Sequence, residues 1–145
     1  MPELLVQGAR KFIRYETVIT EIRRLVYSDI ECAEPISAYD LVCYDGEKIK
    51  RANATDTSRM PVFGMAEDSG NIGDKIDVID TGIVINPSWN FPQSDIGKEI
   101  FVDTTMGGFT TTPPSSSGNV IQRIGRILSP NSIYLNPEED WIIIS

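Results

Sequence analysis

Leu41-Val-Cys-Tyr-Asp-Gly-Glu-Lys-Ile-Lys-Arg51 is the stretch that decides how this chain folds. Two short runs, residues 41–44 and 48–51, flank an Asp-Gly pair at positions 45 and 46. Asp and Gly both accept the positive φ angles of a tight hairpin turn, and such a turn matches the twist of the strands that it joins. The sequence therefore predicts an antiparallel β-hairpin at residues 41–51.

The same rhythm continues on both sides of this hairpin, because short apolar runs rich in Val and Ile alternate with turn signals from residue 36 to residue 144. The further strands predicted in this way span residues 61–66, 75–79, 83–85, 98–102, 109–112, 120–128, 133–135 and 140–144. Asp80-Thr-Gly82 predicts a turn between two of them. So many short strands in one domain predict an all-β fold, a small barrel or sandwich.

Two glycines lie inside apolar runs rather than between them. Gly64 stands within residues 61–66, and Gly125 stands within residues 120–128. A glycine inside a strand typically marks a bulge or a close approach of two backbones. The two positions are interpreted either as equivalent bends of a barrel or as a chance similarity.

The first 35 residues are less regularly patterned, and we expect a partly extended N-terminal arm there, with residues 36–145 as the β-barrel body. Residues 1–24 carry five basic and three acidic side chains, a net charge of +2, whereas the remainder carries eight basic and eighteen acidic ones, a net charge of −10. This asymmetry favours a basic arm on an acidic body, with chance clustering on a solvated face as the alternative. The candidate partner contacts in this arm are Arg10, Lys11, Arg14, Arg23 and Arg24.

The composition argues against several classes of function. A chain of 145 residues fits one domain that folds without needing a disulfide or a metal. The net charge of −8 argues against binding to nucleic acid or to anionic membrane surfaces. Cys32 and Cys43 lack a metal-site spacing and are expected to be free, buried thiols. Neither a signal peptide nor an apolar run of membrane-spanning length is recognisable, so we expect synthesis in a cytoplasm.

No catalytic constellation is apparent. The chain has no His, the residue that most often performs general acid–base work. Asp74, Asp77 and Asp80 alternate between the two faces of a strand and do not converge. Residues 68–74 are rich in oxygen ligands but lack the spacing of a calcium loop, and residues 115–117 hold serines without a nucleophile elbow. We therefore expect no enzyme activity, no metal and no cofactor.

Aromatic residues are the remaining candidates for a binding role. Trp89, Phe91 and Tyr39 are interpreted either as residues that stack on sugars or lie in a partner interface, or as core residues. Trp89 and Phe91 lie in a proline-flanked irregular segment, residues 86–95. Trp141 precedes three isoleucines and is expected in the core.

The order of the motifs between residues 36 and 144 resembles that of the capsid decoration proteins of tailed bacteriophages, also called cement or head-fibre base proteins. The resemblance rests on short motifs of turn chemistry, which are ISAYDLVCYDG (36–46), IKRA (49–52), PVFGMA (61–66), NIGDKIDV (71–78), DTGIV (80–84), IGKEIFVD (96–103), GGFT (107–110) and VIQRIGRI (120–127). Residues 100–102 depart from the family pattern, with Phe101 where Tyr is usual. Residues 1–35 match nothing in that family.

The resemblance implies a small β-barrel or β-tulip fold, a non-enzymatic virion structural protein and a homotrimer docked on the major capsid protein. We accordingly expect a protein of the capsid exterior, made in the host cytoplasm, that decorates and stabilises the phage head. The alternative is a trimeric fibre or tail module that binds host glycans through Trp89 and Phe91. An enzyme that uses carboxylates alone is the third and least favoured interpretation.

Overall fold

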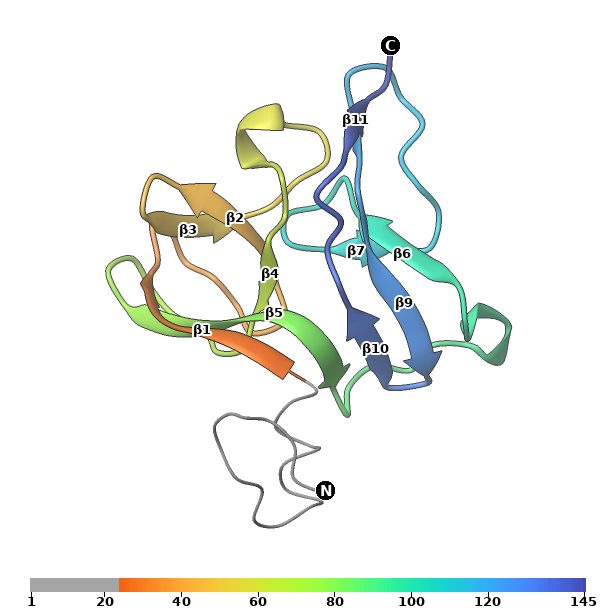
Figure 1. Cartoon of the computed structure of the whole chain (residues 1–145), viewed down its shortest axis with the longest axis horizontal. Coiled ribbons are helices and arrows are strands. Elements are labelled where there is room, and N and C mark those ends of the chain that lie inside the picture. Colours follow the sequence, from red (N-terminus) through yellow and green to blue (C-terminus); the bar gives the residue numbers. More distant parts are fainter. Residues whose placement is uncertain (1–23) are drawn as a thin grey trace, which may run out of the picture.

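The computed structural model of the chain describes residues 24–145, which form an all-β fold (Figure 1). The strands are β1 (Arg24–Glu31), β2 (Leu41–Asp45), β3 (Lys48–Arg51), β4 (Gly64–Ala66), β5 (Lys75–Ile85), β6 (Glu99–Val102), β7 (Phe109–Thr110), β8 (Val120–Ile121), β9 (Arg123–Ser129), β10 (Ser132–Leu135) and β11 (Ile142–Ile143). Two single-turn 3₁₀-helices, η1 (Thr57–Arg59) and η2 (Gln93–Asp95), lie in loops. The all-β class expected from the sequence is confirmed.

Most strands belong to one strongly curled sheet, with the order β3-β2-β4-β5-β10-β9-β6-β7 and with β1 added to β5. The predicted hairpin at residues 41–51 is confirmed, because β2 and β3 pair antiparallel from Val42↔Arg51 to Asp45↔Lys48. After β1, Cys32 bridges to Ile49 of β3, so the first half of the sheet curls until its two ends meet. Figure 1 shows this half, β1–β5, beside the half that contains β6–β11.

The second half is attached to the first through β5 and through loop hydrogen bonds. β10 pairs with the end of β5, from Ser132↔Ile85 to Leu135↔Gly82. Beyond the sheet, the Leu41 N–H donates to the Gly107 carbonyl at 2.9 Å, and the Gly107 N–H donates to the Ala52 carbonyl at 2.8 Å. β8 and β11 form a separate two-stranded ribbon that carries the C-terminus (Figure 1).

Two hydrophobic cores lie on opposite faces of the first half. Side chains alternate along each strand, so neighbours such as Leu41 and Val42 belong to different cores. The larger core fills the space between the two halves and contains Leu41, Met65, Ile79, Ile100, Val120, Ile124, Ile133 and Leu135, among others. The smaller core fills the first half and contains Cys32, Ile36, Val42, Ile49, Ala66, Ile76 and Val78. Both faces of β4 and of the first three residues of β2 are therefore buried.

The glycines inside the apolar runs mark close approaches of the backbone, as the sequence predicts. A Cβ atom on Gly64 would lie 2.5 Å from the carbonyl oxygen of Ile79. A Cβ atom on Gly125 would lie 2.0 Å from the carbonyl oxygen of Tyr134, and Gly125 has a φ of +154°. Only glycine fits at these positions, because any side chain would collide with the backbone of the neighbouring strand.

Three expectations from the sequence need correction. Asp80-Thr-Gly82 is not a turn, because β5 continues through it and pairs on both sides, with Gly82 opposite Arg24 and opposite Leu135. The run at residues 120–128 is two strands, β8 and β9, separated at Gln122. Residues 24–31, expected as part of the arm, form β1 and pair with β5. Within residues 24–145, no helix is long and apolar enough to cross a membrane.

Candidate functional site

Two of the three carboxylates that the sequence offers for chemistry, those of Asp74 and Asp77, accept hydrogen bonds from backbone groups. The Asp74 carboxylate accepts a hydrogen bond from the Asn71 N–H at 2.8 Å, which closes the turn predicted at residues 68–73. The Asp77 carboxylate accepts one from the Asp29 N–H at 3.1 Å. In the part of the chain that the structure describes, no group of three or more His, Cys, Asp or Glu side chains is placed to hold a metal ion.

The two cysteines are buried and are not bonded to each other. Burial raises the pKa of the Cys43 thiol to about 11, and burial together with Asp74 raises the pKa of the Cys32 thiol. Because the thiolate is the reactive form, both thiols are poor nucleophiles at neutral pH. They act as small apolar side chains; Cys32 contributes to the smaller core.

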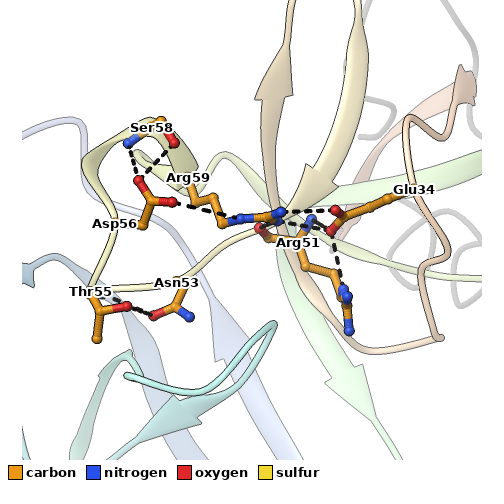
Figure 2. Close-up of polar contacts among 7 residues, drawn as sticks. All are labelled: Glu34, Arg51, Asn53, Thr55, Asp56, Ser58 and Arg59. Atoms are coloured by element: carbon orange, nitrogen blue, oxygen red, sulfur yellow. Dashed lines mark hydrogen bonds and ion pairs between the residues drawn. The ribbon is translucent and has the colours of Figure 1, made fainter.

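The strongest polar cluster is structural and centres on Glu34 (Figure 2). Its carboxylate accepts hydrogen bonds from the Arg59 guanidinium at 2.9 and 3.0 Å and from the Arg51 N–H at 3.0 Å. The hydrogen bond from Arg59 lowers the pKa of Glu34 to about 2. Because Arg59 also donates to the Arg51 carbonyl at 2.9 Å, this cluster fastens η1 and β3 to the segment after β1.

The basic residues expected as partner contacts are only partly within the described residues. Arg10, Lys11, Arg14 and Arg23 lie outside residues 24–145. Arg24 is the first residue of β1, and its guanidinium forms an ion pair with Glu67 at 2.9 Å. The charge of Arg24 is therefore already partnered within the chain.

Trp89 and Phe91 come together in one aromatic cluster with Tyr39 and Phe109. The ring centre of Trp89 lies 5.3 Å from the ring centre of Tyr39, 5.4 Å from that of Phe91 and 5.6 Å from that of Phe109. All four side chains are half-buried and pack against the larger core. The structure supports the core interpretation of these aromatic residues, and whether their partly exposed rings also contact a partner stays a prediction. Trp141 also packs against this core.

Exposed apolar side chains gather on two terminal strands, which the sequence analysis did not single out. On β1, Leu25 is 60% exposed, and Val26 and Tyr27 are also exposed. On β11, Ile142 is 61% exposed and Ile143 is 53% exposed. Runs of exposed apolar residues on edge strands are typical of sites that pair with another chain. The signal available in the sequence was the apolar run itself, which also predicts a buried strand.

A groove of about 470 Å³ lies where the two halves of the fold meet. Its lining comes from β1, from the segment before β4, from β5 and from the segment after β10, and consists of Tyr27, Pro61, Val62, Phe63, Asp80, Thr81, Asn136, Pro137, Glu138 and Glu139. The aromatic wall continues outward, because the Tyr44 ring stacks on Phe63 with ring centres 4.0 Å apart.

The buried side chain of Gln122 links two segments that line this groove. Its amide donates to the Val62 carbonyl at 2.9 Å and to the Glu138 carbonyl at 2.8 Å, and its oxygen accepts from the Val62 N–H at 2.8 Å. Val62 and Glu138 both line the groove but come from different segments of the chain, so one side chain ties these two segments together. Gln122 is 1% exposed, and its three side-chain hydrogen bonds all go to Val62 and Glu138.

Comparison of the chain with models of known protein families and with curated proteins gives no match.

Proposed function

We propose that this chain is a virion structural protein that decorates and stabilises a phage capsid by binding the major capsid protein. The observation that carries the proposal is the pair of apolar surfaces on exposed strands: Leu25, Val26 and Tyr27 on β1, and Ile142 and Ile143 on β11. Such surfaces are interaction sites in soluble proteins. The resemblance of residues 36–144 to capsid decoration proteins supplies the identity of the partner.

The positions of the two surfaces in the chain suggest a different partner for each. β1 continues directly from the basic residues of the N-terminal segment, so we assign this end to the capsid protein, whose acidic patches would receive the Arg and Lys side chains. β11 lies at the C-terminal end (Figure 1). We assign it to contacts between copies of this chain, since soluble assemblies on a symmetric shell are themselves symmetric.

The direct test mixes the purified full chain with undecorated capsid-like particles. We expect the protein to sediment with the particles and to raise their melting temperature, because a ligand that binds only the assembled shell stabilises it by mass action. A protein that leaves both the mass and the melting temperature of the particles unchanged would refute decoration. The fibre or tail module, with host glycans tested on Trp89→Ala, would then become the leading proposal.

The contribution of the N-terminal segment is tested by a chain that begins at Arg24. This truncation keeps β1 and its pairing with β5. We expect it to retain the circular dichroism spectrum of the sheet but to lose particle binding at physiological salt. A matched control keeps the full length and replaces Glu3, Glu16 and Glu21 by Gln, which leaves all basic residues in place. Undiminished binding of the truncated chain would remove the basic segment from the proposed interface.

A further inference from the structure

The groove at the junction of the two halves has a one-sided charge. Three carboxylates line it, and no Lys or Arg does. Glu138 is neutralised by Arg123 at 2.7 Å, whereas Asp80 and Glu139 make no ion pair with any side chain of residues 24–145. Two negative charges that have no ion-pair partner in the described part of the chain lie beside a concave surface, and such charges attract cations.

Much of the lining of the same groove is apolar and aromatic. Pro61, Val62, Phe63 and Pro137 contribute to it together with Tyr27, whose ring centre lies 5.8 Å from that of Phe63. Aromatic faces attract the cationic groups of Lys and Arg, and the long stems of these side chains cover apolar surface while their charged ends reach polar groups. The aromatic lining and the negative charge of the groove therefore both favour a Lys or Arg side chain.

The groove is also preformed. Gln122 ties Val62 to Glu138, and the Glu138 N–H donates to the Arg123 carbonyl at 3.0 Å. Fixed walls lower the cost of ordering the protein when a ligand binds. Because the groove is built from four segments that the fold holds in register, an extended chain can enter it without rearrangement of the sheet.

We propose that this groove binds an extended basic segment of a partner protein, with a Lys or Arg side chain directed to Asp80 and Glu139 and a neighbouring apolar residue packed on Tyr27 and Phe63. The inference rests on the proposed function in one respect: the segment belongs to the capsid protein. The recognition is local and peptide-like, and it is separate from the exposed apolar side chains of β11.

The test is calorimetric titration of the full chain with three acetylated and amidated peptides. The first repeats Lys-Pro-Leu three times, the second replaces each Lys by Glu, and the third replaces each Leu by Ser. We expect measurable binding of the first peptide, no binding of the second, and weaker binding of the third because its apolar contact is lost. The affinity of the first should fall as salt is added, since Glu139 is exposed and Asp80 is only partly buried, so that salt screens both charges.

Charge-matched variants locate the binding. Asp80→Asn with Glu139→Gln removes both carboxylates that have no ion pair within residues 24–145 and should lower the affinity for the first peptide by about ten-fold, the size expected for two charge contacts that are at least partly open to solvent. Glu47→Gln with Asp68→Asn removes the same charge from exposed positions that do not line the groove and should leave the affinity unchanged. Tyr27→Ala tests the aromatic wall and should also weaken binding.

The outcomes separate this inference from capsid decoration. Equal affinity for the Lys and Glu peptides, or unchanged affinity of the Asp80→Asn and Glu139→Gln variant, overturns the groove as a basic-segment site. If the wild-type chain binds particles but no peptide, and the Asp80→Asn and Glu139→Gln variant binds particles equally well, decoration stands and the groove inference fails. If the chain binds the Lys peptide through Asp80 and Glu139 but ignores particles, the groove stands as a site for a basic segment, whereas decoration and the assignment of that segment to the capsid protein both fail.

Discussion

Gly125 is a position where the fold leaves no room for a side chain. An alanine there would place its Cβ 2.0 Å from the Tyr134 carbonyl oxygen, and its φ of +154° is one that L-residues rarely adopt. We predict that Gly125→Ala lowers the free energy of unfolding by about 3 kcal/mol, the upper range for a strained backbone. Urea denaturation followed by tryptophan fluorescence measures the difference.

Gly118→Ala is the matched control for this prediction. Gly118 also has a positive φ, +87°, but a Cβ there would meet no atom within 4 Å. We expect Gly118→Ala to lower the free energy of unfolding by about 1 kcal/mol, because only the unfavourable backbone conformation contributes. Equal losses for the two variants would show that the approach of β9 to β10 does not require a glycine.

Gln122 combines full burial with three hydrogen bonds, so its removal should be costly. Gln122→Met keeps the length of the side chain but leaves both backbone groups of Val62 and the Glu138 carbonyl without this partner. We predict a loss of about 2–4 kcal/mol in the free energy of unfolding, since each buried polar group left unpaired costs about 1–3 kcal/mol. Gln93→Met, at an exposed position in η2, should change thermal stability little. A Gln122→Met protein with the melting temperature of the wild type would contradict a stabilising role for the hydrogen bonds of this side chain.

Glu34 makes stability depend on pH in the acid range. Its pKa is lowered from 4.5 in the unfolded chain to about 2 in the folded protein, chiefly by the hydrogen bond from Arg59. A lowered folded-state pKa contributes stability that is fully present above pH 4.5 and is lost as the pH falls toward 2. We predict that Glu34→Gln is less stable than wild type at neutral pH and that the difference shrinks over this window. Parallel urea titrations along the pH series would reveal a constant gap if the carboxylate played no such role.

At the scale of the elements, turn signals in the sequence predicted one hairpin correctly but also predicted a turn inside a continuous strand. Asp45-Gly46 predicted the β2–β3 hairpin because that signal is contained in adjacent residues. Asp80-Thr-Gly82 carries similar residues, yet it lies within β5. There, pairing of Thr81 with Leu25 and of Gly82 with both Arg24 and Leu135 supplies ladder partners on both sides. Tertiary pairing overrode local preference, and that pairing cannot be read from residues 80–82 alone.

β1 is the element whose loss we expect to open the first half of the sheet. It pairs with β5 from Arg24↔Gly82 to Glu31↔Lys75, and Cys32 after it bridges to β3. A chain that begins at residue 36 lacks both contacts and exposes the smaller core around Ile76 and Val78. We predict that this chain unfolds at a much lower temperature and less cooperatively than a chain that begins at Arg24. Coincident melting curves by circular dichroism would show that residues 24–35 are dispensable for the body.

At the scale of the whole molecule, the sites could not be predicted from sequence because they are assembled from distant segments. The groove combines Tyr27, residues 61–63, Asp80 and residues 136–139, and no spacing rule links them. The exposed isoleucines of β11 resemble a core strand in sequence, and only their position on a two-stranded ribbon leaves them at the surface. Trp89, Phe91 and Tyr39 were identifiable from sequence as aromatic candidates. Their contacts with one another, and with Phe109 of β7, depend on the tertiary fold.

The oligomeric state tests whether the β11 surface joins copies of this chain. We predict a homotrimer, with a mass by light scattering of three times the 16.1 kDa of one chain. Ile142→Glu with Ile143→Glu should yield a folded monomer, because both side chains are exposed within the chain and would bring charges into the interface. Ile72→Glu is the control, since Ile72 is 69% exposed in the turn before β5 and is not assigned to contacts. A wild-type protein with the mass of one chain, or a trimer that survives the double substitution, would place the contact between copies elsewhere or remove it altogether.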